Sequence, residues 1–142
     1  MQIEISNSDV FISKEDKEQV QASVVCMPSG VYFRRLYQPK TSTVLYFSKY
    51  LPLVLQQNGC RKIIVDYREK DPLTAEMRRL MVKNVKPILN CIDTIIFIMN
   101  PNRMAIQRVM LEFFVKAYLR HRQIKVYFCS SKEEAIEKLE SS

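Results

Sequence analysis

Glycine is scarce in this sequence of 142 residues, which contains only Gly30 and Gly59. A loop that binds the phosphates of a nucleotide places several glycines close together between a strand and a helix. The two glycines lie far apart, and neither opens a helix after a strand. The sequence therefore excludes both the dinucleotide-binding fingerprint and the P-loop.

Histidine is rarer still, because His121 is the only one. It lies at the expected end of a helix, where a cation interacts favourably with the helix dipole, so a structural role is favoured over that of a catalytic base. The four cysteines form no Cys-x-x-Cys pair, and one histidine completes no standard zinc spacing with them. The sequence predicts no catalytic residue, no metal site and no cofactor, with the cysteines as free thiols in the core.

Long apolar runs are also missing. The longest, such as residues 95–99, are far shorter than the roughly 20 residues that cross a bilayer. The N-terminus lacks the basic and then apolar stretches of a secretory signal. We therefore expect a cytoplasmic protein without a transmembrane segment.

The charge is concentrated in the middle of the chain. Residues 21–130 contain 18 basic and 6 acidic side chains, whereas residues 1–20 and 131–142 are both net acidic. A basic region of this kind favours anionic partners, although a solvated surface is the alternative. The length and the 47% of hydrophobic residues predict one globular domain over residues 1–142.

The first 40 residues have the patterns of β-structure. Residues 1–6 alternate between apolar and polar, and residues 10–12 form a short apolar return. Residues 23–27 and 31–37 flank the turn sequence Pro28-Ser29-Gly30, which predicts an antiparallel hairpin. This region is expected to leave a sheet edge through which the chain forms a homodimer.

From residue 41 the pattern alternates between helix and strand. Strands are predicted at residues 61–66, 93–99 and 124–129. Helices are predicted before and between them at residues 41–57, 74–88 and 100–122, with a last one after the capping box of Ser131 and Glu134. The N-cap candidates are a threonine or serine among residues 41–43 for the first of these helices and Thr74 for the second. Met77, Leu80 and Ile88 of the second helix and Val109 of the third are expected to face inward.

This order predicts the fold class. The right-handed crossover rule places the three later strands parallel in one sheet with helices packed on its faces. We expect an α/β fold with a mixed sheet, in which N-terminal antiparallel strands precede a parallel core.

Asp66 is the most informative carboxylate, because it ends a strand at the edge where open α/β sheets place their ligands. A charged loop containing Arg68 follows, and Thr74 then starts a helix whose N–H groups favour an anion. Asn100, Asn102 and Arg103 follow the next strand and should lie on the same edge. The alternative for Asp66 is that it only caps its own loop.

The chain resembles the SpoIIAA-like branch of the STAS superfamily. The resemblance rests on the N-terminal β-region, on residues 62–66 and 93–98, and on a terminal strand followed by residues 131–139, with Glu134-Ala135 and Leu139. It implies a non-enzymatic regulatory module that binds a protein partner or a small ligand, and distant relatives with the CRAL-TRIO fold carry lipids. The family's phospho-acceptor serine is missing here, and Thr74 is the nearest stand-in.

The leading hypothesis is therefore a STAS-like regulatory or binding module for a protein partner or a small anionic or lipidic ligand. Two alternatives remain. A small enzyme would use Asp66 in a strand-end cleft, but no nucleophile and base accompany it. Nucleic acid would bind the basic central region, where tyrosines and phenylalanines are interleaved, but such aromatics are more often core residues and no known nucleic-acid motif is present.

Overall fold

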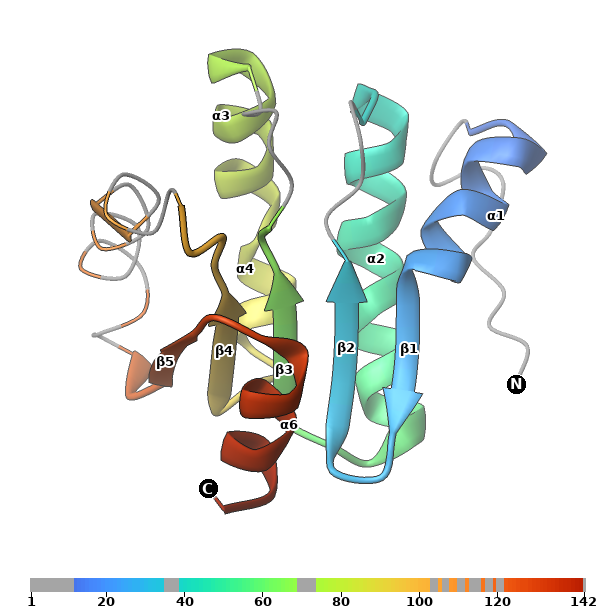
Figure 1. Ribbon diagram of the computed structural model, residues 1–142. Coiled ribbons are helices and arrows are strands. Elements are labelled where there is room, and N and C mark those ends of the chain that lie inside the picture. Colours follow the sequence, from blue (N-terminus) through green and yellow to red (C-terminus); the bar gives the residue numbers. More distant parts are fainter. Residues whose placement is uncertain are drawn as a thin grey trace.

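The computed structural model describes residues 12–34, 39–68, 74–102 and 122–141, together with six single positions between 103 and 121. Its elements form a five-stranded sheet with helices on both faces (Figure 1). The strands are β1 (Val24–Met27), β2 (Gly30–Arg34), β3 (Lys62–Asp66), β4 (Thr94–Ile98) and β5 (Lys125–Cys129). Their spatial order is β1-β2-β3-β4-β5, and all neighbours are parallel except the β1–β2 pair. The α/β fold with a mixed sheet is confirmed.

The N-terminal hairpin is confirmed, but it is preceded by a helix. Val24 pairs with Phe33 and Met27 with Gly30 across the predicted turn. Helix α1 (Lys14–Ser23) comes before β1, so the prediction of β-structure is wrong there. Ser13 caps α1 by accepting from the Asp16 N–H at 3.1 Å, and Val20 is the only residue of the helix that is buried. One buried position gives almost no apolar periodicity, which is why the pattern did not predict this helix.

The predicted strands at residues 1–6 and 10–12 lie outside the described residues, apart from Ile12. Strand β1 is one outer strand of the described sheet and β5 is the other. Homodimer formation through a sheet edge stays a prediction.

Helix α2 (Thr41–Asn58) is confirmed, ends one residue later than predicted and contains Pro52. Its N-cap is Lys40, one position before the predicted caps, and the Lys40 N–H donates to Thr43 Oγ1 at 3.3 Å. Gly59 ends the helix with a φ of 64°, in the left-handed region that glycine adopts at little cost.

The second predicted helix is divided into α3 (Ala75–Asn84) and α4 (Lys86–Leu89). Thr74 is the N-cap of α3, as predicted. The predicted inward stripe is wrong for α3, where Met77 and Leu80 are half-buried and no residue is buried, and right for Ile88 in α4. The physical reason is visible in Figure 1. Of these two helices, α3 extends past the ends of the strands, and α4 lies against the sheet.

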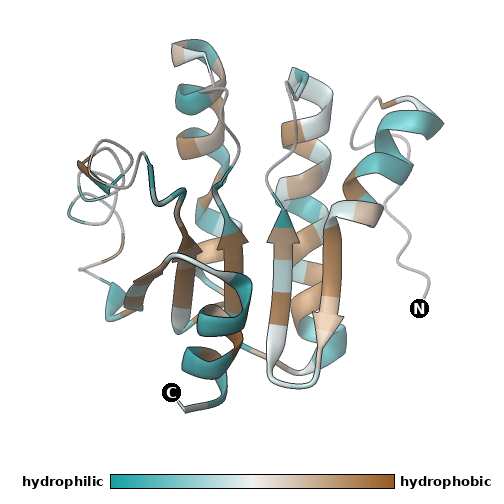
Figure 2. Cartoon of the chain, in the orientation of Figure 1, coloured by the Kyte–Doolittle hydropathy of each residue, from teal (hydrophilic) through white to brown (hydrophobic). Residues whose placement is uncertain are grey.

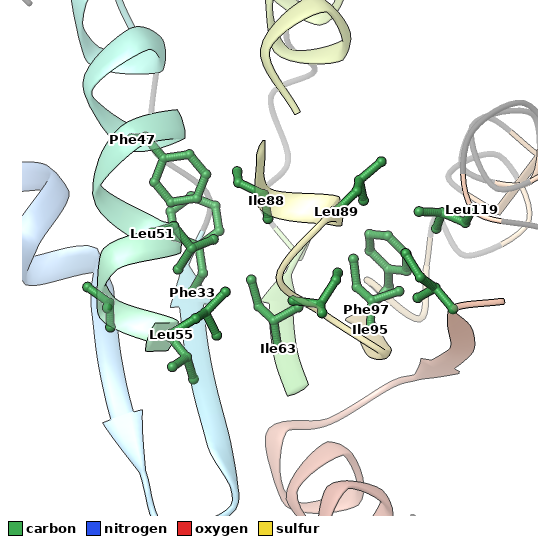
Figure 3. Close-up of a cluster of buried hydrophobic side chains, with 14 of the residues drawn as sticks. Phe33, Phe47, Leu51, Leu55, Ile63, Ile88, Leu89, Ile95, Phe97 and Leu119 are labelled. Carbon is green, nitrogen blue, oxygen red and sulfur yellow. The ribbon is translucent and has the colours of Figure 1, made fainter. Parts of the chain in front are cut away.

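The two faces of the sheet carry separate clusters. Alternate residues such as Phe33, Ile63 and Phe97 pack with α2 and α4. Figure 3 shows Phe47, Leu51 and Leu55 of α2 beside this face. The other alternate residues, such as Ile64, Ile96 and Cys129, pack with helix α6 (Lys132–Ser141). Strands with both faces covered are nearly continuous apolar runs, and all five residues of β4 are buried.

Helix α6 lies close to the sheet at Gly30. A Cβ atom placed on Gly30 would be 2.9 Å from Leu139 Cδ2 and 2.9 Å from the Lys62 carbonyl oxygen. Glycine at this position therefore allows the close approach of α6 to β2. Ala135 and Leu139 are the buried residues of the helix, and its outer surface is hydrophilic (Figure 2).

Most of the predicted helix at residues 100–122 lies outside the described residues. Leu119 is fully buried and belongs to the cluster of α2 and α4. Val109 was predicted to face inward, but its exposure is 68%, so that prediction is wrong. Among the described helices, none has the length and apolar character that crossing a membrane would require.

Candidate functional site

The parallel strands β2, β3, β4 and β5 end at one side of the sheet, which we call the carboxyl edge. In the register, Arg34 pairs with Asp66, Asp66 with Ile98, and Ile98 with Cys129. The sequence predicted this convergence for the three later strands, and the structure adds β2. The candidate site lies where β2 and β3 end.

Asp66 is the centre of this site. Its side chain is only 7% exposed, and both of its oxygens accept hydrogen bonds. The Arg68 guanidinium donates from Nε to Oδ1 at 2.9 Å and from Nη2 to Oδ2 at 2.7 Å. The Arg68 backbone N–H donates to Oδ1 at 3.2 Å, and the Tyr32 hydroxyl donates to Oδ2. Asp66 does cap its own loop, and it also fixes two side chains.

The strand register explains why Tyr32 meets Asp66. Tyr32 pairs with Ile64 across the β2–β3 ladder, and Asp66 is two residues beyond Ile64 on the same strand. Side chains two positions apart point to the same face of a sheet. The phenol of Tyr32 can therefore reach along this face to the carboxylate, on the side that α6 covers.

The electrostatics of this group favour a charged Asp66 and a neutral Tyr32. Burial would raise the pKa of Asp66, but hydrogen bonds from Arg68 and Tyr32 outweigh burial and lower this pKa below its ordinary value. Burial, together with the hydrogen bond to Asp66, raises the pKa of Tyr32 to about 12. The carboxylate likewise raises the pKa of Arg68. At neutral pH the group is thus an ion pair with a phenol donor.

Arg68 retains a donor edge that Asp66 does not use. The guanidinium has five N–H donors in one plane, and Nε and Nη2 on its side face the carboxylate. The geometry of the group directs the two Nη1 protons and the second Nη2 proton away from Asp66. Because the Arg68 side chain is 42% exposed, it can offer this end to an oxyanion.

Lys132, in the first turn of α6, lies over the ring of Tyr32. Its Nζ atom lies 4.4 Å from the centroid of the Tyr32 ring, within the range of a cation–π contact. The capping box before it is half confirmed. The Glu134 N–H donates to Ser131 Oγ at 3.1 Å, but the Glu134 carboxylate accepts from Ser130 instead, from the N–H at 3.2 Å and from Oγ at 3.1 Å.

The sequence-based prediction missed Tyr32 and Lys132. Tyr32 is among the interleaved aromatics that were expected in the core, and it is in fact buried at 7% exposure. The signal that could have found it is the strand period, which places the side chains of Tyr32 and Ile64 on one face once β2 pairs with β3.

Asn100, another of the predicted site residues, contacts this group. Its side-chain amide donates to the Arg68 carbonyl oxygen at 3.4 Å, and its own carbonyl oxygen accepts from the Asn102 N–H at 3.0 Å. Among the described residues, Asn102 is thus joined to the site through its backbone N–H. Arg103 lies outside the described residues.

Within the described residues, no hydrogen bond or ion pair joins Thr74 to Asp66 or Arg68. Its hydroxyl accepts from the Met77 N–H at 3.2 Å, and the helix that it caps points its first turn away from the sheet (Figure 1). A loop that includes undescribed residues separates Thr74 from Arg68.

The described ranges contain no metal-binding cluster, because no three histidine, cysteine, aspartate or glutamate residues are close enough to hold a metal ion. The cysteines are free thiols, and Cys129 is buried, but Cys26 is exposed, so the prediction of a core position is wrong for it. Tyr32, Phe33 and Tyr46 are buried, which leaves their rings unable to stack on nucleotide bases.

Comparison with known protein families, with curated proteins and with solved structures finds no match to this chain. Its function is therefore inferred from the contacts around Asp66.

Proposed function

We propose that this chain is a non-enzymatic binding module whose carboxyl edge recognises an anionic group on a small ligand. The observation that supports the proposal is the geometry of Arg68. A buried carboxylate fixes one side of its guanidinium, while the end of the group stays exposed. A donor that is already oriented loses less conformational entropy when it binds.

The contacts of Asp66 support binding rather than catalysis. A general acid or base must be able to exchange its proton with a substrate. Asp66 is buried, its lowered pKa keeps it charged, and Arg68 and Tyr32 bond to both of its oxygens. Its role in the proposed module is to position Arg68.

The charges around the site also favour an anion. Arg34 pairs with Asp66 in the register and is exposed, and Lys132 lies over Tyr32. Among the described residues at the site, these cations and Arg68 outnumber the acidic groups Asp66 and Glu134. Electrostatic attraction of this kind raises the rate of encounter with anionic ligands.

The proposed module is of the STAS type. The resemblance is consistent with the hairpin before the parallel strands and with the closing strand and helix, β5 and α6. A regulatory role and a protein partner that presents the anionic group on a side chain belong to the same proposal. The phospho-acceptor role of Thr74 has no support beyond its exposed position.

The proposal can be tested by NMR titration of the ¹⁵N-labelled protein with sodium benzoate and with sodium phenyl phosphate. Saturable shifts are expected for the amides of Arg68 and of residues 130–132. Arg68→Gln should weaken binding at least about tenfold, which corresponds to about 1.4 kcal/mol. Arg61→Gln is the matched control, because Arg61 precedes the same strand and forms only an exposed pair with Asp93 at 3.7 Å.

Loss of Arg68 leaves Asp66 buried without its cation, which can destabilise the fold. The double variant Asp66→Asn with Arg68→Gln avoids the unpaired charge and should also lack binding. If folded variants without Arg68 bind these anions as the wild type does, the proposal is wrong.

A further inference from the structure

We infer that the anionic group recognised at this edge is a phosphate monoester, held between Arg68 and Lys132. The inference rests on the proposed function and names its ligand class. The two cations belong to distant parts of the sequence, and each contacts one member of the hydrogen-bonded Tyr32–Asp66 pair.

The contacts connect these side chains in series. Lys132 Nζ lies 4.4 Å from the Tyr32 ring centroid, and the Tyr32 hydroxyl donates to Asp66 Oδ2. Arg68 Nη2 donates to the same oxygen at 2.7 Å. One phenol ring and one carboxylate therefore separate the ammonium group from the guanidinium group.

The side chains of the two cations differ in how freely they can move. Asp66 fixes Arg68 through two hydrogen bonds, so its exposed end has a set direction. Among the described residues, the contact that Lys132 makes is the cation–π contact with Tyr32, and no hydrogen bond holds its flexible four-carbon stem in place. Lys132 can leave the ring and approach an anion that Arg68 already holds.

This arrangement distinguishes between two kinds of oxyanion. A carboxylate has two oxygens in one plane, and the end of a guanidinium can bond to both of them. A phosphate monoester has a third oxygen outside that plane, and it carries a charge of about −1.5 to −2 at neutral pH. Lys132 can bind the third oxygen, so it should contribute to the binding of a phosphate monoester and contribute little to that of a carboxylate.

The C-terminal helix offers a matched control. Lys138 Nζ lies 4.6 Å from the centroid of the Tyr127 ring, in the same kind of contact and on the same helix as Lys132. Tyr127 lies on β5 and makes no described contact with Asp66 or Arg68. Substitution of either lysine removes the same charge and the same contact, but only Lys132 is at the site.

The test compares phenyl phosphate with benzoate, which carry the same ring, by NMR titration of the wild type, Lys132→Gln and Lys138→Gln. We expect the wild type to bind phenyl phosphate about tenfold more tightly, a difference of about 1.4 kcal/mol. Lys132→Gln should lower the affinity for phenyl phosphate to that for benzoate. Lys138→Gln should keep the wild-type preference for phenyl phosphate over benzoate. A wild type without this preference, or a Lys132→Gln variant that retains it, would overturn the inference.

The outcomes separate the two proposals. If both anions shift the amides of the carboxyl edge equally and Arg68→Gln abolishes the shifts, the binding module stands and the phosphate inference fails. If neither anion shifts them, both fail. The source of the phosphate is then tested by co-sedimentation with phosphatidylcholine vesicles that contain phosphatidic acid or, at equal charge, phosphatidylglycerol. Selective binding to phosphatidic acid identifies a lipid headgroup, whereas binding of phenyl phosphate without vesicle binding identifies a soluble phosphate monoester.

Discussion

The Tyr32 hydroxyl donates a hydrogen bond to the Asp66 carboxylate across 34 positions of the sequence. The bond joins the end of β3 to β2, the strand that connects the parallel core with the hairpin. Lys132 lies over the Tyr32 ring, and Arg68 donates to the same carboxylate. The candidate site and part of the fold's stability therefore depend on the same contact.

Tyr32→Phe tests the contribution of this bond to stability. The ring and its contact with Lys132 remain, but the carboxylate loses a donor in a buried position. Because hydrogen bonds to charged groups contribute about 1.5–3 kcal/mol, the free energy of unfolding should fall by about this amount in urea denaturation. Tyr127→Phe is the control, since this half-buried ring also lies under a lysine, and it should change stability by less than about 0.5 kcal/mol. Equal effects of the two substitutions would contradict the assigned bond.

The charge of Asp66 predicts a pH dependence. Its pKa in the folded protein is below the ordinary value of 3.8, so the carboxylate stabilises the fold above that pH and this contribution is lost as the pH falls through the lower, folded-state pKa. Asp66→Asn should therefore be less stable than the wild type at pH 7, and the difference should shrink below about pH 4. Urea denaturation at pH 7, 5 and 3 measures this difference.

Asp93→Asn serves as the control for Asp66→Asn. Asp93 is exposed, and its pair with Arg61 spans 3.7 Å, so its substitution should have a small effect on stability. A difference between wild type and Asp66→Asn that stays constant from pH 7 to pH 3 would show that the charge of Asp66 does not stabilise the fold.

The sequence predicted the fold because hydrophobic patterns mark buried strands well. The alternation of helices and strands from residue 41 and the apolar run of residues 93–99 predicted the parallel core, and the turn sequence Pro28-Ser29-Gly30 predicted the hairpin; all five residues of β4 are buried. Helix α1 was missed because it buries only Val20, and α3 was expected to pack inward although it buries nothing. Amphipathic spacing shows which face of a helix is apolar, but it does not show whether the sheet extends far enough to cover that face.

The candidate site was predicted only in part. Asp66 and Arg68 were found because they follow a strand directly, and Asn100 follows the next strand for the same reason. Tyr32 and Lys132 were not found, because their places depend on the register of β2 and on the position of α6 across the sheet. Thr74 makes no described hydrogen bond to this group, and a helix start in the sequence does not reveal how far the helix projects from the sheet.

Gly30→Ala tests the close approach of α6 to the sheet. The added methyl group would lie 2.9 Å from both Leu139 Cδ2 and the Lys62 carbonyl oxygen, so the chain must shift. Overpacking of this kind typically costs about 1–3 kcal/mol. Leu139→Ala removes one of the two obstacles, and the double variant should therefore lose less stability than the sum of the single losses.

Gly59→Ala provides the comparison for Gly30→Ala. A Cβ on Gly59 meets nothing within 4 Å, and its cost of about 1 kcal/mol would come only from the positive φ of 64°. The losses in free energy of unfolding caused by Gly59→Ala and Leu139→Ala should therefore add up in the double variant. If the losses caused by Gly30→Ala and Leu139→Ala also added up, Leu139 would not limit the space at Gly30.

Thr74→Ala separates the cap of α3 from the candidate site. The substitution removes the acceptor for the Met77 N–H, and loss of such a cap costs about 0.5–2 kcal/mol. Because α3 buries no residue, the loss should appear mainly as faster amide hydrogen exchange in residues 75–84. The affinity for phenyl phosphate should stay at the wild-type value, since the first turn of α3 points away from the sheet. A Thr74→Ser variant keeps the hydroxyl and should restore the protection. Reduced affinity in Thr74→Ala, with affinity restored in Thr74→Ser, would instead place Thr74 within the binding site.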